Sequence, residues 1–132
     1  MQITAVVSNS TAGHEVSVRS GELSQSLRVP PKRLGRGSGV NGGEFLMLAL
    51  ATCYCNDLFR EAERMGVPID SVEVEASAEF AGIGLAATDI RYTARVESSA
   101  SSDQVARLLR ETDAVAEVHN TVRRGVPVRL DF

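Results

Sequence analysis

The almost wholly apolar run from Phe45 to Cys55 constrains this chain more than any other feature of its sequence. A helix that is apolar on every side has to be buried on every side. Asn41 and Glu44 have the spacing of a capping box just before the run, and Gly66 has the position of a helix stop after it. We therefore expect one long helix over residues 41–65, with its first half fully buried.

The size and charge of the chain limit what it can do. With 132 residues and 43% hydrophobic content it can bury one core, so we expect a single domain. The formal net charge is only -3, which argues against binding to nucleic acid or to an anionic membrane surface. No leader-like start and no apolar run of membrane-spanning length is present, so we expect a cytoplasmic protein.

Strand-like and helix-like patterns flank the long helix. Alternation of apolar and polar residues predicts strands in the N-terminal 30 residues, a β-hairpin, and a last strand, and capping signals predict two further helices. The predicted ranges are 1–30 for the N-terminal strands, 69–97 for the hairpin, 102–124 for the two helices and 126–131 for the last strand. No βαβ repeat occurs, so the fold class is α+β with antiparallel sheets.

The glycine-rich segment before the helix formally matches a dinucleotide-binding fingerprint from Gly37 to Gly42. The context that this motif needs is missing, because Pro30 and Pro31 separate it from any strand. We therefore do not expect nucleotide binding. A local anion site formed by Arg33, Arg36 and the helix N-terminus stays open as an alternative.

Both cysteines, Cys53 and Cys55, lie inside the apolar run. Residues two apart on a helix differ by about 200° in direction, so the two thiols face different sides and cannot form a disulfide without breaking the helix. The same geometry argues against a shared metal ion, and only two histidines are available elsewhere. We expect two free thiols, no bound metal and no cofactor.

A buried cysteine is often only a small hydrophobic side chain, and a reactive one needs a nearby cation or helix N-terminus. Cys53 lies three turns into its own helix, too far from the N-terminus to benefit. Asp57, one turn on, disfavours a thiolate, and Arg60 can neutralise Asp57. Cys53 is the leading candidate for chemistry, with inert packing as the alternative.

Three segments, in this order, resemble the OsmC and Ohr family of thiol-dependent hydroperoxide reductases. They are Gly39–Glu44, Phe45–Cys53 and Val118–Val128. The resemblance implies an OsmC-like fold, with antiparallel β-sheets packed on a long central helix, and an intertwined homodimer whose active sites lie at the subunit interface. It also implies that Cys53 attacks the peroxide, and it gives Cys55 no catalytic role.

The sequence departs from this family pattern at the groups that support the reacting cysteine. The family's second cysteine falls at Ala116, so an external thiol would have to act as the reductant. The supporting carboxylate falls at Gly43, with Glu44 one residue along. The family's arginine comes from the N-terminal strands, where Arg19 is the first candidate and Arg28 and Arg36 are the others.

His119 lies one turn after Ala116 and is the remaining candidate. A histidine that reached Cys53 would lower the thiol pKa and indicate a Cys-His pair. The alternative is a polar residue near a helix end, where a histidine suits the helix dipole.

Three hypotheses follow from the sequence. The first is a reductase of organic hydroperoxides that uses Cys53 with an external thiol, supported by Arg19, Glu44 and His119. The second is a non-peroxidatic member of the same fold that binds a small apolar ligand at the dimer interface. The third is a purely structural or partner-binding dimer.

Overall fold

The computed structural model describes the whole chain, Met1–Phe132, as two compact units. The first unit is Met1–Phe45 and the second is Leu46–Phe132. The strands of the first unit pair only with one another. The long helix α1, Gly42–Met65, begins in the first unit and continues in the second.

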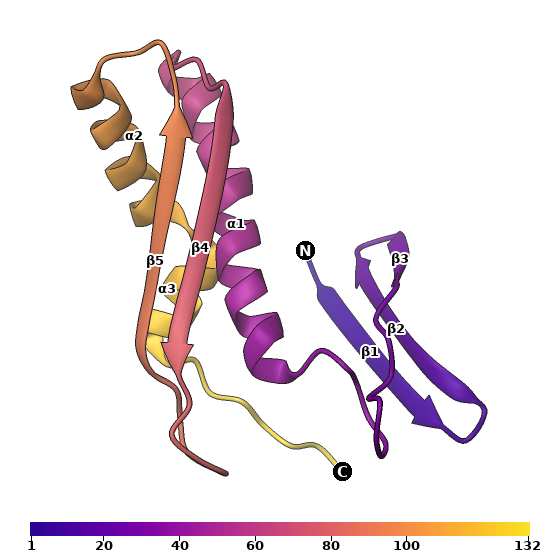
Figure 1. Cartoon of the computed structure of the whole chain (residues 1–132). Helices are drawn as coiled ribbons and strands as arrows, with labels where there is room; N and C mark the ends of the chain where they lie inside the picture. Colours follow the sequence, from indigo (N-terminus) through magenta and orange to yellow (C-terminus); the bar gives the residue numbers. More distant parts are fainter. The chain divides into compact units, whose positions relative to one another are not determined.

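The first unit is built on a three-stranded antiparallel sheet in the order β1-β2-β3 (Figure 1). The strands span Ile3–Ser10, Gly13–Ser20 and Leu23–Leu27. Val16 lies opposite Val7 on one side and Leu27 on the other, and it is the one buried hydrophobic residue of this sheet. The strands predicted within residues 1–30 from the alternation are confirmed.

The segment between β3 and α1 is held together by backbone hydrogen bonds. An isolated bridge joins Pro31 to Ser38, and the Lys32 amide donates to the Gly37 carbonyl at 2.9 Å. The Gly39 amide donates to the Pro30 carbonyl at 2.7 Å, and a Cβ on Gly39 would lie 2.8 Å from that same oxygen. Only glycine fits this close approach of two backbone segments.

Helix α1 begins and ends where the sequence predicts. The Glu44 carboxylate accepts from the Asn41 amide at 2.8 Å, and the Asn41 side chain accepts from the Glu44 amide at 2.9 Å. This reciprocal pair is a capping box, so Glu44 is engaged at the helix start. Gly66, with a φ of +67°, ends the helix in the left-handed conformation that glycine adopts without strain.

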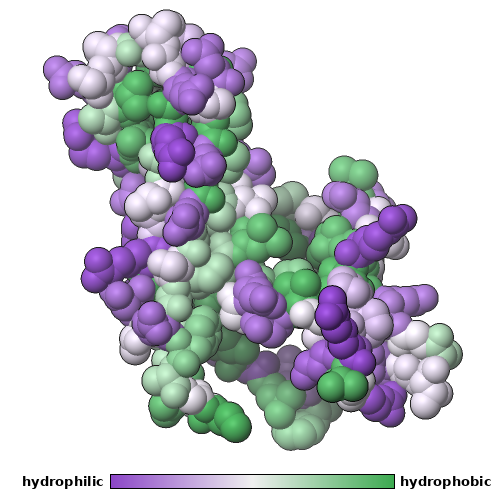
Figure 2. Space-filling view, in the orientation of Figure 1, coloured by the Kyte–Doolittle hydropathy of each residue, from purple (hydrophilic) through white to green (hydrophobic).

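The first half of α1 is less buried than the sequence suggests. Between Phe45 and Cys55 only Leu50 and Tyr54 are buried, and Leu48 is 58% exposed. The expectation of burial on every side is therefore wrong for a single chain. Other apolar side chains also reach the surface, where green patches interrupt the hydrophilic purple in Figure 2.

The second unit packs a β-hairpin and two helices around the C-terminal half of α1 (Figure 1). Strands β4 (Ser71–Glu79) and β5 (Thr88–Glu97) are antiparallel, with Val74 opposite Ala94. Their apolar faces meet α1 in one core whose buried members are Tyr54, Leu58, Ala62, Val67, Leu108 and Ala116. The hairpin predicted over residues 69–97 is confirmed.

Two helices follow the hairpin, as predicted. Helix α2, Ser102–Val115, starts with a capping box between Ser101 and Gln104, and α3 spans Glu117–Arg124. Residues 126–131 form no strand, in contrast to our expectation. A strand needs a neighbour for its backbone hydrogen bonds, and this segment pairs with none, leaving Val128 98% exposed.

None of the helices is both long and apolar enough to cross a membrane.

Candidate functional site

Cys53 and Cys55 are both free and partly exposed on α1. Residues two apart on a helix differ by about 200° in direction, so the thiols of Cys53 and Cys55 point to different sides. Cys53 has polar partners from two helices, whereas Cys55 makes no side-chain hydrogen bond. The site therefore forms around Cys53.

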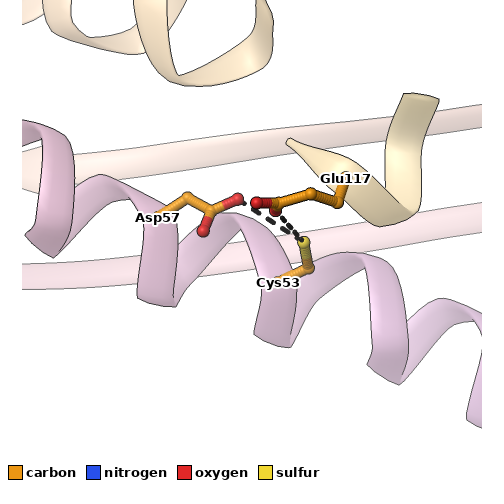
Figure 3. A group of neighbouring side chains, drawn as sticks. All are labelled: Cys53, Asp57 and Glu117. Atoms are coloured by element: carbon orange, nitrogen blue, oxygen red, sulfur yellow. Dashed lines mark hydrogen bonds between the residues drawn. The ribbon is translucent and has the colours of Figure 1, made fainter. Parts of the chain in front are cut away.

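Two carboxylates face the Cys53 sulfur (Figure 3). The thiol donates to Asp57 Oδ2 at 3.5 Å, and Glu117 Oε2 lies 4.0 Å from the sulfur. Asp57 is one turn further along α1, the spacing that places two side chains on one helix face. Glu117 is the first residue of α3, so the fold brings two segments distant in sequence to the same sulfur.

Arg60 pairs with the two carboxylates and makes no hydrogen bond to the Cys53 sulfur. Its Nη1 lies 2.8 Å from Asp57 Oδ1 and 3.8 Å from Glu117 Oε1. Asp57 is only 4% exposed, and a buried carboxylate needs such a partner. No guanidinium of the second unit makes a hydrogen bond to Cys53. The sequence pattern did not single out Glu117, although its place directly after Ala116 is the signal that points to it.

The environment of Cys53 favours the protonated thiol at rest. Burial is the largest influence and raises the pKa of Cys53, and the charges of Asp57 and Glu117 raise it further. The hydrogen bond from the Val118 backbone amide acts in the opposite direction. Burial also raises the pKa of Asp57 above its ordinary value. Burial thus raises the pKa of both partners in this hydrogen bond.

His119 lies in an aromatic cluster and does not bond to Cys53. Its ring centre is 4.5 Å from that of Tyr92 and 5.8 Å from that of Tyr54. The residue is 3% exposed and neither ring nitrogen has a hydrogen-bond partner. Burial lowers the pKa of His119, so the ring is neutral at pH 7. The structure thus gives His119 a packing position.

Beside this aromatic cluster, the Tyr92 hydroxyl donates to Asp113, which also pairs with Arg123 at 2.5 Å. An open pocket of about 340 Å³ adjoins these groups. Its lining residues are Tyr54, Tyr92, Ala94, Leu109, Arg110 and Asp113. The second unit therefore offers a concave surface with aromatic and charged walls.

The other two candidates, Arg19 and Glu44, belong to the first unit. Arg19 is on β2 opposite Thr4 and Ser24, and it forms no ion pair. Glu44 holds the start of α1, as described above. Cys53 belongs to the second unit.

The thiol of Cys53 and the carboxylates of Asp57 and Glu117 all lie within 4.8 Å of one another. That donor set has the composition of a divalent cation site. Arg60 already compensates both carboxylates, so the charge that a cation would supply is provided by the protein itself. We assign no metal to this cluster.

A pocket of about 390 Å³ in the first unit tests the anion-site alternative. Lys32 and Arg36 line it together with the β1–β2 turn, and neither forms an ion pair. Arg33 does not line the pocket. Nothing in the pocket identifies an anion as its ligand.

The sequence of this chain is similar to those of known proteins. The model of the OsmC-like protein family matches residues 35–131. A stretch of 60 residues is 35% identical to the uncharacterized protein YmaD of Bacillus subtilis (strain 168) and covers 46% of this chain. The match spans only 40% of that relative's length.

Solved structures share the fold at low sequence identity. An OsmC-like protein from Mycoplasma pneumoniae is 20% identical, with a TM-score of 0.64 over 95% of this chain and 87% of that one. An organic hydroperoxide resistance protein from Elizabethkingia anophelis is 16% identical, with a TM-score of 0.63 over 93% of this chain and 89% of that one. At these identities the likeness concerns the fold alone.

Proposed function

Because the chain belongs to the OsmC-like protein family, whose model matches residues 35–131, we propose that it reduces organic hydroperoxides with Cys53. Some proteins of similar fold are described as hydroperoxide resistance proteins, which supports this choice of substrate class. We place the reaction in the reducing cytoplasm, where free thiols such as Cys53 and Cys55 persist.

One observation carries the proposal. The fold brings Cys53 to the start of α3, where the Val118 amide lowers the pKa of its thiol and Glu117 Oε2 lies 4.0 Å from its sulfur. Ala116, the position at which the family resemblance expects a second cysteine, directly precedes these residues and is fully buried. The partly exposed thiol thus lies beside the segment that a two-cysteine reductase would use.

The reaction needs an external reductant, because Ala116 carries no thiol. Cys53 sulfur attacks the terminal oxygen of the hydroperoxide, the O–O bond breaks, and the products are a sulfenic acid and an alcohol. One external thiol then forms a mixed disulfide with Cys53 and releases water. A second external thiol then attacks this mixed disulfide. The Cys53 thiol is restored, and the two external thiols leave joined as a disulfide.

We also propose that the active form is a homodimer. Leu48 and Phe59 on α1 are 58% and 50% exposed, and a second copy would cover such apolar surface. In this arrangement an arginine of the first unit, with Arg19 as the first candidate, could meet the Cys53 of the other copy. Light scattering of the purified chain measures the oligomeric state directly.

The test of the function is consumption of an alkyl hydroperoxide in the presence of a dithiol. We expect turnover by the native chain and by Cys55→Ser, and none by Cys53→Ser. Cys55 is the matched control, because it is a thiol on the same helix with similar exposure but no polar partner. Equal turnover by Cys53→Ser would exclude the proposal.

A second candidate function is binding of a small, largely apolar molecule without peroxide chemistry. The pocket of about 340 Å³ beside Tyr54 and Tyr92 favours it, as does a Cys53 sulfur that faces carboxylates and no cation. This function predicts no peroxide turnover and a rise in melting temperature with an apolar ligand. Peroxide turnover that depends on Cys53 would exclude it.

A further inference from the structure

The Cys53 sulfur faces a buried carboxylate from its own helix. The thiol donates to Asp57 Oδ2 at 3.5 Å, while Asp57 Oδ1 is held by Arg60 at 2.8 Å. Cys53 and Asp57 are four residues apart on α1, so this contact is a property of one helix. It requires neither the first unit nor a second copy.

We propose that Asp57 is a catalytic residue of the Cys53 reaction, taking the thiol proton as the sulfur attacks and giving it to the leaving alkoxide. This inference rests on the proposed reduction of hydroperoxides. It gives Asp57 the role of acid and base in the reaction. The family resemblance expects a supporting carboxylate at Gly43, where this chain has none.

The chemistry of the step requires such a group. A neutral thiol is a weak nucleophile, and an adjacent base activates it. As the new S–O bond forms, the O–O bond breaks and its electron pair goes to the alkoxide oxygen. The proton moves from sulfur to Asp57 and then to that oxygen, so the products are the Cys53 sulfenic acid and a neutral alcohol.

The surroundings of Asp57 suit this role. Asp57 is 4% exposed, so bulk water has little access to its proton. Arg60 occupies Oδ1 and leaves Oδ2 facing the sulfur, which makes Arg60 a positioning residue. Glu117, whose side chain is 71% exposed, lies 3.8 Å from Arg60 and is the outer member of the cluster. The Val118 amide stabilises charge that develops on sulfur.

The experiment compares two reactions of the same sulfur in the native chain and in Asp57→Asn. Iodoacetamide releases iodide, which needs no proton, whereas an alkyl hydroperoxide releases an alkoxide, which does. Loss of the carboxylate charge lowers the pKa of Cys53, so alkylation at pH 7 is expected to be at least as fast as in the native chain. Peroxide reduction is expected to fall about 100-fold, the usual size of a general acid–base contribution.

The measured quantity is the ratio of the peroxide rate constant to the alkylation rate constant. We expect the ratio to fall about 100-fold in Asp57→Asn and to recover partly in Asp57→Glu, which restores the carboxyl group. Glu63→Gln, at an exposed carboxylate on the same helix that makes no side-chain bond to the cluster, is the matched control and keeps the native ratio. A ratio unchanged in Asp57→Asn overturns the inference while the proposed function stands. A native chain that reduces no hydroperoxide instead overturns the proposed function, and the inference falls with it.

Arg60 provides a separate readout, the pH dependence of the peroxide rate. Removal of its guanidinium in Arg60→Ala takes a cation away from Asp57 and raises the pKa of that carboxyl. The acidic limb of the rate profile is then expected to move to higher pH, and Arg60→Lys to move it back. An acidic limb that stays in place in Arg60→Ala contradicts the role of Arg60 as the group that positions Asp57.

Discussion

Substitution of His119 by phenylalanine tests the physical account of the second unit most fully. His119 is 3% exposed, both ring nitrogens lack partners, and its ring lies 4.5 Å from that of Tyr92. An imidazole with two unpartnered nitrogens loses hydration on folding and gains no hydrogen bond in return. His119→Phe retains the aromatic packing and removes that loss. The variant is therefore expected to be at least as stable as the native chain at pH 7.5.

The size of the effect follows from how the difference in unfolding free energy between the two proteins depends on pH. Burial lowers the pKa of His119 in the folded state, below its ordinary value of 6.5. The stability contributed by the neutral ring is therefore complete above pH 6.5 and is lost as pH falls towards the folded-state pKa. Since unfolding binds one extra proton in this window, the native chain loses up to about 1.4 kcal/mol per pH unit relative to His119→Phe.

The assay is urea unfolding of both proteins at several pH values between 7.5 and 5. Asp57, Asp113 and Arg123 also surround His119, but they are present in both proteins and their titration largely cancels in the comparison. The difference in unfolding free energy should grow in favour of His119→Phe as the pH falls. Parallel curves across the whole range would refute the assignment of a buried, unpartnered imidazole.

Other substitutions test the remaining contacts. Leu58→Ala removes a fully buried side chain from the core and should cost about 2–5 kcal/mol of unfolding free energy in urea. Ser101→Ala removes the cap of α2 and should cost about 0.5–2 kcal/mol in the same assay, and no loss would contradict the capping box. Because burial raises the pKa of Cys53, alkylation of this thiol followed by peptide mass spectrometry should be slow at pH 7 and should accelerate with pH beyond the midpoint of an exposed cysteine. A midpoint below that of an exposed cysteine would contradict the protonated resting thiol.

The parts of the fold that depend on local pattern could be predicted from the sequence. The capping box of Asn41 and Glu44 and the stop at Gly66 define α1 because these signals act within a few residues. The hairpin of β4 and β5 follows in the same way from strict alternation.

The parts that depend on distant partners could not be predicted. The last strand does not form, because a strand depends on a neighbour that the pattern of Val126–Leu130 cannot specify. The exposure of Leu48 likewise reflects what packs against α1 and not the composition of the helix.

The candidate site likewise contains some groups that the sequence could place and others that only the tertiary fold brings together. Cys53, Asp57 and Arg60 are spaced along one helix, so the sequence already places Asp57 and Arg60 beside the thiol. Glu117 and the Val118 amide reach Cys53 only through the tertiary packing of α3. The sequence leaves His119 open as a partner of Cys53, but the packing of α3 turns it towards the tyrosines.

Mass spectrometry after a stoichiometric pulse of alkyl hydroperoxide tests the proposed chemistry of Cys53 most directly. The account predicts a sulfenic acid at Cys53, seen as the gain of one oxygen atom or as a dimedone adduct on its peptide, and none at Cys55. An unmodified Cys53, or oxidation confined to Cys55, would contradict it.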